Sequence, residues 1–358
     1  MYYRVGLALK TTEGGDYNTH IRAVTELLSG INPYKETIKS FNNLEKDPGN
    51  KGYAYFPGIM YVNTVLFLIH LILKLNFGVY TSIPFLFELP GIIATVFVCT
   101  FFIKFFNKKD NFAMLFCTLY WLLDPYLLSR HLNLGYDAVT IALLLWSLYY
   151  LEKDDVLSST LFSLGVIIKT FPITLLFIFL LKAKNKLIFI ATGIIIFLSF
   201  SIPFFRSFND FSTYIQGSLL VHGNRFVQGR PFLYYISYLY SIELFRIIPF
   251  SFYSISAIVS GWIWPFLFKI KGFITDKYEL AIFPFLSFYI LTPVLNRTYM
   301  VWAIPFFLVG SYQIFEKKHK WAFYAVNLAY WAFSYWYLYQ WKDGFHIRLP
   351  VFDNVSTI

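Results

Sequence analysis

The chain has 358 residues, a formal net charge of +10, and a composition that is 57% hydrophobic and only 14% charged. Soluble domains carry about a quarter charged residues, so a one-domain soluble enzyme is excluded by composition. A disordered or nucleic-acid-binding chain would need far more charge, and we expect no nucleic-acid partner. Aromatic residues reach 22%, which is typical of bilayer proteins with interfacial anchors. The composition therefore predicts a polytopic membrane protein.

The first 55 residues are polar and rich in turn residues, such as Gly14-Gly15 and Asp47-Pro48-Gly49. We interpret residues 1–55 as an outer-face first loop that carries short juxtamembrane helices, and residues 56–358 as a multi-pass transmembrane domain. An exported segment of this kind usually follows a helix that inserts it, and the residues after Met1 are too few and too polar for that. We therefore expect a first transmembrane helix to be encoded upstream of Met1.

Beyond residue 55, apolar runs long enough, or nearly long enough, to cross about 30 Å of hydrocarbon dominate the chain. The stretch 156–182 is too long for one helix, and Pro172 disfavours helix at the residue before it, so we divide it at Lys169. The fold class is thus an all-α transmembrane bundle of about ten helices. The expected helices cover residues 84–106, 112–128, 134–151, 156–168, 171–182, 187–205, 247–270, 279–294, 299–315 and 321–340.

Short loops rich in Lys and Arg stay on the cytoplasmic side, so basic clusters orient the chain. All of them fall inside if residues 56–76 only embed in the outer interface and residues 232–246 are interfacial. If 56–76 crossed, the first cluster would face outward. We therefore predict a plasma-membrane protein whose N-terminal segment faces the exterior. The clusters are Lys108-Lys109, Lys182–Lys186, Lys269–Lys271 and Lys317–Lys320.

With this orientation, the ionisable residues of the apolar region collect at the outer ends of spans. Ionisable residues inside a membrane are costly and mark functional cavities. Carboxylates can serve as general base or metal ligand, and Lys and Arg can hold an anionic group such as phosphate. We therefore predict one outer pocket in which carboxylates act as base or metal ligand and basic side chains bind an anionic group. Its candidate members are Asp16, Glu88, Asp124, Asp137, Lys169, Arg225, Arg230 and Arg297.

Several short segments occur in an order that is similar to a known family. They are Gly14-Gly15-Asp16-Tyr17-Asn18-Thr19-His20, Gly30-Ile31-Asn32-Pro33-Tyr34, Tyr53-Ala54-Tyr55-Phe56-Pro57, Gly135-Tyr136-Asp137, Lys169-Thr170-Phe171-Pro172 and Asn296-Arg297-Thr298-Tyr299. In this order the chain resembles the GT-C superfamily of membrane glycosyltransferases. The resemblance is nearest to the polyprenol-phosphate-mannose-dependent branch and covers most of the chain.

The resemblance implies a GT-C-like bundle and an inverting transfer of a sugar, such as mannose, from a polyprenyl phosphate. The acceptor would be the hydroxyl of a lipid or glycan on the outer face. The first-loop aspartate, Asp16, would be the catalytic base. Other expected substrate-binding residues are Lys169, Arg230 and Arg297 at the donor phosphate, Glu88, Asp124 and Asp137 at the acceptor or a metal, and His20 and Tyr299.

Structural roles compete with these assignments. Asp16 follows two glycines, Asp137 starts a span after Gly135, and each could be a helix N-cap, with Gly30 ending the first helix. Glu88 and Asp124 could pair with an internal basic residue, and Lys169 could extend toward headgroups. For His20, we expect an exposed surface position.

Two other functions remain as alternatives. An oligosaccharide ligase or polymerase would depend on Arg225 and Arg230, whereas a lipid-sugar flippase or transporter would show an internal repeat with midplane charges. We find no convincing repeat, no nucleotide-binding loop and no metal-binding Cys/His spacing. No cofactor is required by the sequence, and the need for a divalent metal is left open.

Overall fold

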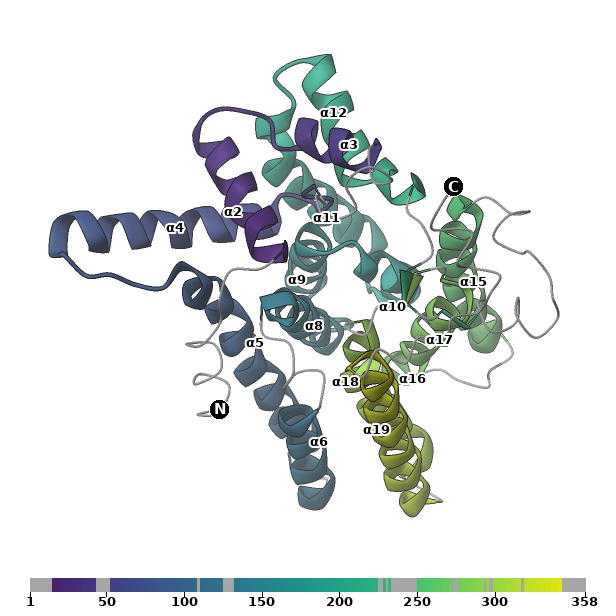
Figure 1. The fold of residues 1–358 in the computed structure, drawn as a ribbon. Coiled ribbons are helices and arrows are strands. Elements are labelled where there is room, and N and C mark those ends of the chain that lie inside the picture. The colour runs from purple at the N-terminus through teal and green to yellow at the C-terminus, as the bar shows by residue number, and fades with distance from the viewer. Residues whose placement is uncertain are drawn as a thin grey trace, which may run out of the picture. The chain divides into compact units, whose positions relative to one another are not determined.

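The fold is a helical assembly, seen in a computed structural model (Figure 1). The structure describes residues 15–42, 52–107, 110–124, 132–224, 228–229, 231–232, 250–270, 272, 276–292, 294–295, 299–316 and 319–342. The expected interfacial stretch 232–246, Arg225, Arg230, Arg297 and the Lys108-Lys109 cluster lie wholly or almost wholly outside these ranges.

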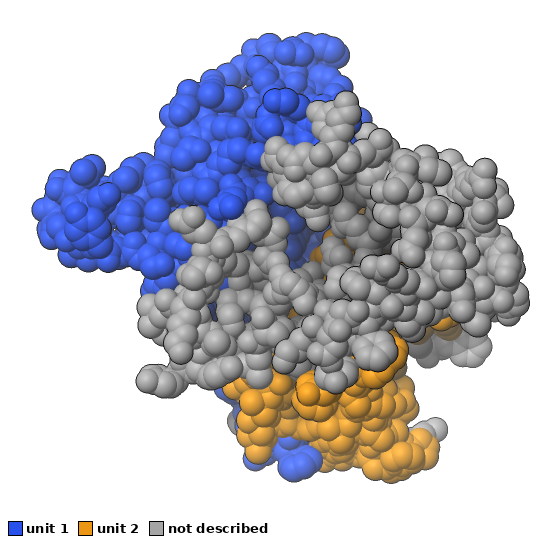
Figure 2. Space-filling model, in the orientation of Figure 1, with its two compact units in different colours: residues 1–114, 130–172, 184–222 blue, residues 115–129, 173–183, 223–358 orange. Residues whose placement is uncertain are grey.

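The chain forms two compact units, shown in blue and orange in Figure 2. Unit 1 comprises Met1–Met114, Arg130–Pro172 and Lys184–His222, and unit 2 comprises Leu115–Ser129, Ile173–Ala183 and Gly223–Ile358. Unit 1 thus joins part of the polar N-terminal segment to apolar helices from later in the chain. The domain boundary expected at residue 55 stays a prediction.

Unit 1 is built from apolar helices that pack in chain order and from three more polar helices, α2, α3 and α12. Here α5 packs on α8, α8 on α9, and α9 on α11, while α2 lies on α4 and α3 lies on α12. The helices are α2 (Gly15–Leu28), α3 (Tyr34–Asn42), α4 (Gly58–Phe77), α5 (Ile83–Phe106), α8 (Leu132–Tyr150), α9 (Asp155–Ile168), α11 (Lys186–Ser201) and α12 (Phe208–Ser218). A 3₁₀ turn, η2 (Ile202–Phe204), continues α11.

Unit 2 contains most of α6 (Asn111–Leu123) and the C-terminal helices. Helix α15 packs on α17, and α18 packs on α16, α17 and α19. Two short parallel strands pair Gln228 with Val294 and Gly229 with Leu295. The elements are α10 (Leu176–Lys182), α15 (Phe250–Ile270), α16 (Lys277–Leu280), α17 (Ile282–Leu291), α18 (Met300–Phe315), α19 (Lys320–Lys342), β1 (Gln228–Gly229) and β2 (Val294–Leu295).

The all-α prediction is confirmed, since these two-residue strands are the only strands among the described residues. Three helices are long and apolar enough to cross a membrane: α4, α5 and α11 continued by η2. Helices α6, α9 and α18 are apolar but shorter. Helices of this length and composition are typical of a membrane protein. Helix α4, which was expected only to embed, is one of the three long helices, and the predicted number of spans stays a prediction.

Helix ends follow local signals in the sequence. Gly30 has a φ of +74°, and the N–H groups of Gly30 and Ile31 donate to the carbonyl oxygens of Leu27 and Glu26, which closes α2 as predicted. The predicted break at Lys169 is confirmed: α9 ends at Ile168, Lys169 is extended, and a 3₁₀ turn, η1 (Phe171–Leu175), follows.

Candidate functional site

The candidate site lies in unit 1, where α2, the turn before α4, α5, α8 and the end of α9 bring polar side chains together. The Nζ atom of Lys169 is 2.6 Å from Oδ1 of Asp137. The Asp137 side chain is fully buried, and that of Lys169 is 12% exposed. A charge removed from water in this way is stabilised by an opposite charge with hydrogen-bonding geometry. The Lys169–Asp137 ion pair is therefore a specific structural feature of the break that follows α9.

Asp137 has a different position from the one expected. Helix α8 begins at Leu132, so Asp137 is the sixth residue of the helix and cannot be its N-cap. Its partner Lys169 is 32 residues away in sequence. The N-cap interpretation is wrong because the helix starts a turn and a half earlier, and Asp137 faces the end of α9 instead.

Tyr55 lies between this ion pair and His20. The Lys169 Nζ atom is 5.7 Å from the centroid of the Tyr55 ring, within the range of cation–π attraction. The His20 ring stacks on Tyr55 with the centroids 6.4 Å apart. A cationic side chain and an imidazole thus approach one aromatic ring from α9 and α2.

His20 is buried, and the expectation of a surface histidine is wrong. Its ring centroid is 5.9 Å from that of Tyr53 and 5.7 Å from that of Tyr136. Its exposed fraction is 8%. Three tyrosines that come from later parts of the chain cover the face of α2 on which His20 lies, and the local sequence around His20 gives no sign of them.

Hydrogen bonds hold the turn that carries Tyr53 and Tyr55. The Tyr53 hydroxyl donates to the carbonyl oxygen of Phe56 at 2.9 Å and accepts from the Met60 N–H at 3.0 Å. Burial raises the pKa of Tyr53 well above its ordinary value, so the hydroxyl stays protonated and remains a donor. The Tyr34 hydroxyl of α3 donates to the Tyr55 carbonyl oxygen at 2.9 Å. The orientation of Tyr55 is therefore set by α3 and α4 together.

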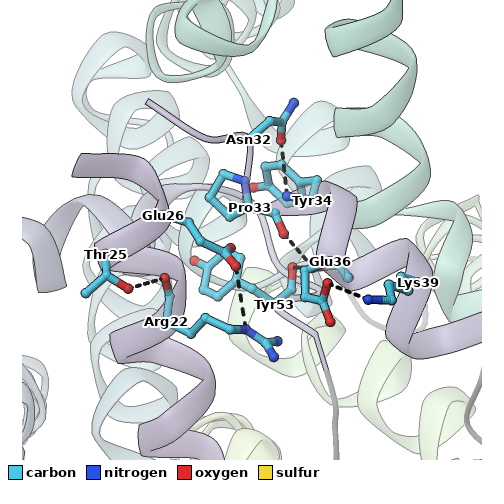
Figure 3. Close-up of polar contacts among 10 residues, drawn as sticks. Arg22, Thr25, Glu26, Asn32, Pro33, Tyr34, Glu36, Lys39 and Tyr53 are labelled. Atoms are coloured by element: carbon cyan, nitrogen blue, oxygen red, sulfur yellow. Dashed lines mark hydrogen bonds and ion pairs between the residues drawn. The ribbon is translucent and has the colours of Figure 1, made fainter. Parts of the chain in front are cut away.

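Helix α3 is itself anchored at its start. The Asn32 side chain accepts a hydrogen bond from the Tyr34 N–H at 3.1 Å, and Figure 3 shows this contact beside Tyr53. Charged residues lie on the outer surfaces of α2 and α3. The Arg22 Nε atom is 3.9 Å from Oε1 of Glu26, and the Lys39 Nζ atom is 3.8 Å from Oε2 of Glu36 (Figure 3). Helices α2 and α3 thus carry charged pairs on their outer surfaces and make aromatic contacts on their buried sides.

Asn63 is a member of the cluster that the sequence did not single out. It is fully buried in α4, and the Tyr136 hydroxyl donates to its Oδ1 atom. Among the described residues, the Asn63 Nδ2 atom and the buried Thr140 hydroxyl have no hydrogen-bond partner. Unsatisfied buried polar atoms are costly, so these groups suit the hydroxyls of a bound ligand. The only sequence signal was an asparagine within an apolar run.

Glu88 extends the cluster to α5. It is buried, and its carboxylate lies within electrostatic reach of the Tyr136 hydroxyl. Asp16 is the second residue of α2, not the residue before it, and stands one turn ahead of His20. Tyr17, next to Asp16, packs 6.0 Å from Phe87 of α5. The start of α2 is therefore seated beside the segment that carries Glu88.

The remaining predicted residues fall elsewhere. Asp124 and Tyr299 belong to unit 2, where Asp124 is fully buried and the Tyr299 ring stacks on Trp302 at 4.1 Å. Arg225, Arg230 and Arg297 lie outside the described residues. Pairing of Glu88 or Asp124 with a basic residue stays a prediction. Among the described residues, no group of three or more His, Cys, Asp or Glu side chains could hold a metal ion.

The arrangement can bind an anion and separate it from a proton acceptor. Lys169 supplies the cation, Asp137 orients it, and Tyr55 separates it from His20. Comparison with family models, with curated proteins and with solved structures finds no match to this chain. The chemistry of the cluster is therefore the basis on which a function is proposed.

Proposed function

We propose that this chain is an integral membrane glycosyltransferase of GT-C type. It would move a sugar, such as mannose, from a polyprenyl phosphate to the hydroxyl of a lipid or glycan on the outer face of the plasma membrane. The observation that carries the proposal is the buried Lys169–Asp137 ion pair beside Tyr55 and His20, at a break between apolar helices. A lipid-linked donor could reach such a site without its chain leaving the hydrocarbon.

In the proposed reaction, the acceptor oxygen attacks the anomeric carbon from the face opposite the phosphate. The Asp16 carboxylate takes the proton of the acceptor hydroxyl. The bond between the anomeric carbon and the phosphate oxygen breaks through an oxocarbenium-like state, and its electron pair stays on the phosphate. The configuration is thereby inverted. The leaving group is already an anion, so it needs a cation and no acid.

Lys169 is the proposed cation. Its ammonium group would stabilise the charge that grows on the leaving phosphate, and a preorganised charge in a dry site is more effective than one in water. Asp137 would act as a positioning residue that orients the Lys169 ammonium group. Asn63, Thr140 and Glu88 are candidates for sugar or acceptor hydroxyls. Phosphate roles for Arg230 and Arg297 stay predictions.

The proposal includes a topology. We propose that α4 embeds in the outer interface, which keeps the basic clusters inside and the N-terminal segment outside. Two facts support it. Figure 1 shows α4 lying across the line of α5 instead of alongside it. One side of α4 buries Asn63 and His70, whereas Leu68 and Ile72 are exposed.

The test is transfer from radiolabelled polyprenyl-phosphate-mannose in membranes that contain the wild type or Asp16→Asn, with host lipids and glycans as acceptors. We expect the wild type to transfer and Asp16→Asn to be inactive at equal expression, with donor binding nearly unchanged. Asp154→Asn is the matched control. Asp154 caps α9 through the Leu157 N–H at 2.9 Å, and asparagine caps equally well.

Two results would contradict the proposal. Substantial transfer by Asp16→Asn would remove Asp16 as the base. Movement of the labelled lipid across the membrane by a wild type that transfers no sugar would favour the flippase alternative. Lys169→Ala should weaken donor binding as well as rate, and Lys169→Arg should recover part of the binding.

A further inference from the structure

Helix α12 exposes an apolar stripe. Phe208 is 85% exposed, and Phe211 and Leu219 are each 41% exposed, with the half-buried Ile215 between them. These residues are spaced by three or four positions, so they fall on one side of the helix. The flanking residues Asn209 and Gln216 are polar and also exposed. The stripe is therefore narrow and bordered by polar side chains.

The opposite side of α12 is occupied by α3. Tyr214 is fully buried, with its ring centroid 5.2 Å from that of Tyr34. Gly217 lies so close to α3 that an added Cβ atom would be 2.7 Å from the Tyr34 Cβ. Asn32 donates to the Asp210 carboxylate at 3.4 Å. Because α3 covers this side, the stripe points away from unit 1.

The place of α12 in the chain identifies what lies against the stripe. Helix α11 with η2 is long and apolar enough to cross a membrane, and only 17% of its most apolar stretch is buried in the protein. Only residues 205–207 separate η2 from α12. If α11 crosses the membrane, α12 begins where α11 leaves the hydrocarbon. The exposed Arg206 at this junction suits lipid phosphates.

We propose that α12 lies in the membrane interface and binds the bilayer surface through Phe208, Phe211, Ile215 and Leu219. A helix with an exposed apolar stripe bordered by polar side chains lies in the plane of the interface, with the stripe among the upper parts of the acyl chains. The contacts of Tyr34 then connect the bilayer to the candidate site, since Tyr34 contacts Tyr214 and also donates to the Tyr55 carbonyl. This proposal does not depend on the glycosyltransferase function.

The test is nitroxide scanning of the full chain in lipid nanodiscs, with Cys99 and Cys117 replaced by alanine. Labels are placed at Phe208→Cys and Phe211→Cys on the stripe, and at Asn209→Cys and Gln216→Cys as controls on the polar flank. Collisions with oxygen, which concentrates in hydrocarbon, are compared with collisions with a water-soluble nickel chelate. We expect a higher ratio of oxygen to nickel collisions at 208 and 211 than at 209 and 216.

Two outcomes would overturn the proposal. Equal, nickel-dominated collisions at all four positions would mean that the stripe faces water. Immobile labels at 208 and 211 that neither reagent reaches would mean that another protein surface covers it. Because Phe208 is mostly exposed at the first residue of the helix, its replacement leaves the packing on α3 intact, and this position decides the result if Phe211→Cys does not fold.

Discussion

At the scale of single residues, the Lys169–Asp137 pair makes an energetic prediction. Lys169→Met leaves the fully buried Asp137 carboxylate without this partner, and breaking a buried pair costs about 3–5 kcal/mol. Asp137→Asn should also destabilise. The double variant should lose less than the sum of the two, with a coupling of about 1–3 kcal/mol. Melting of all four proteins in one detergent measures this, and strict additivity would show that the pair contributes nothing.

Glu26 makes a prediction about pH. Partial burial raises its pKa above the ordinary value of 4.5; nearby Arg22 lowers it, and Glu36 raises it further. A raised pKa in the folded state means that the protonated carboxyl favours folding. This contribution is complete below about pH 4.5 and is lost as the pH rises through the folded-state pKa.

Glu26→Gln removes the carboxyl group whose ionisation lowers the stability of the folded state. We expect the variant to melt higher than the wild type at neutral pH, by an amount that shrinks as the pH falls toward 4.5. Glu152→Gln, at an exposed carboxylate, is the control and should follow the wild-type profile. A melting temperature for Glu26→Gln that equals the wild type at every pH would contradict the expected effect.

Sequence reasoning found individual residues better than their partners. Lys169 was found because Pro172 predicts a helix break in an apolar run, which is a local signal. Its pairing with Asp137 was not found, because the contact joins residues 32 positions apart. His20 was assigned to the surface because nothing near it in sequence reveals that Tyr136 covers it. Whether these residues act on a sugar donor stays a prediction.

At the scale of elements, the contact between α3 and α12 depends on Gly217. Gly217→Ala would place a methyl group 2.7 Å from the Tyr34 Cβ and 3.0 Å from its carbonyl oxygen. The two helices would have to separate, and overpacking of this kind costs about 1–3 kcal/mol. We expect a lower melting temperature. Gly165→Ala is the matched control, since its nearest atoms would be 3.8 Å away; equal melting of the two variants would contradict the tight contact.

The helices themselves were largely predictable, and their packing was not. Expected helices at 84–106 and 187–205 agree with α5 and α11 to within a few residues. Long apolar runs and capping residues are features of the local sequence, so they can be recognised without knowledge of the packing. Helices α2 and α3 were expected only in outline, as short juxtamembrane helices without stated bounds. Nothing in the sequence around Tyr34 indicates that Tyr214, nearly two hundred residues later, packs against it.

At the scale of the whole molecule, the course of α4 decides the orientation of everything after it. If α4 embeds in the outer interface, its two ends lie on one side of the membrane. Val79, just beyond the left-handed Gly78 that ends α4, would then face the exterior. A Val79→Cys variant without Cys99 and Cys117 should react with an impermeant maleimide on intact cells.

Two further positions control this experiment. Ser207→Cys, between α11 and α12, should react on intact cells, and Asn185→Cys, at the other end of α11, should react only after the cells are opened. Protection of Val79→Cys, with the reactions of Ser207→Cys and Asn185→Cys exchanged, would mean that α4 crosses the membrane. The proposed orientation would then be reversed for every later helix.

The tight approach of Thr37 to Gly52 has a practical consequence. The Thr37 hydroxyl donates to the Tyr53 carbonyl oxygen at 3.1 Å, and a Cβ atom on Gly52 would fall 2.2 Å from the Thr37 Cα. Gly52 is thus held against the middle of α3, so Thr37 and Gly52 lie close together in space. Lengthening a chain segment between two such points costs only about 0.6 kcal/mol for each doubling. A peptide tag inserted between Asn42 and Gly52 would give an affinity handle for purification. It would leave the turn that carries Tyr53 and Tyr55 in place.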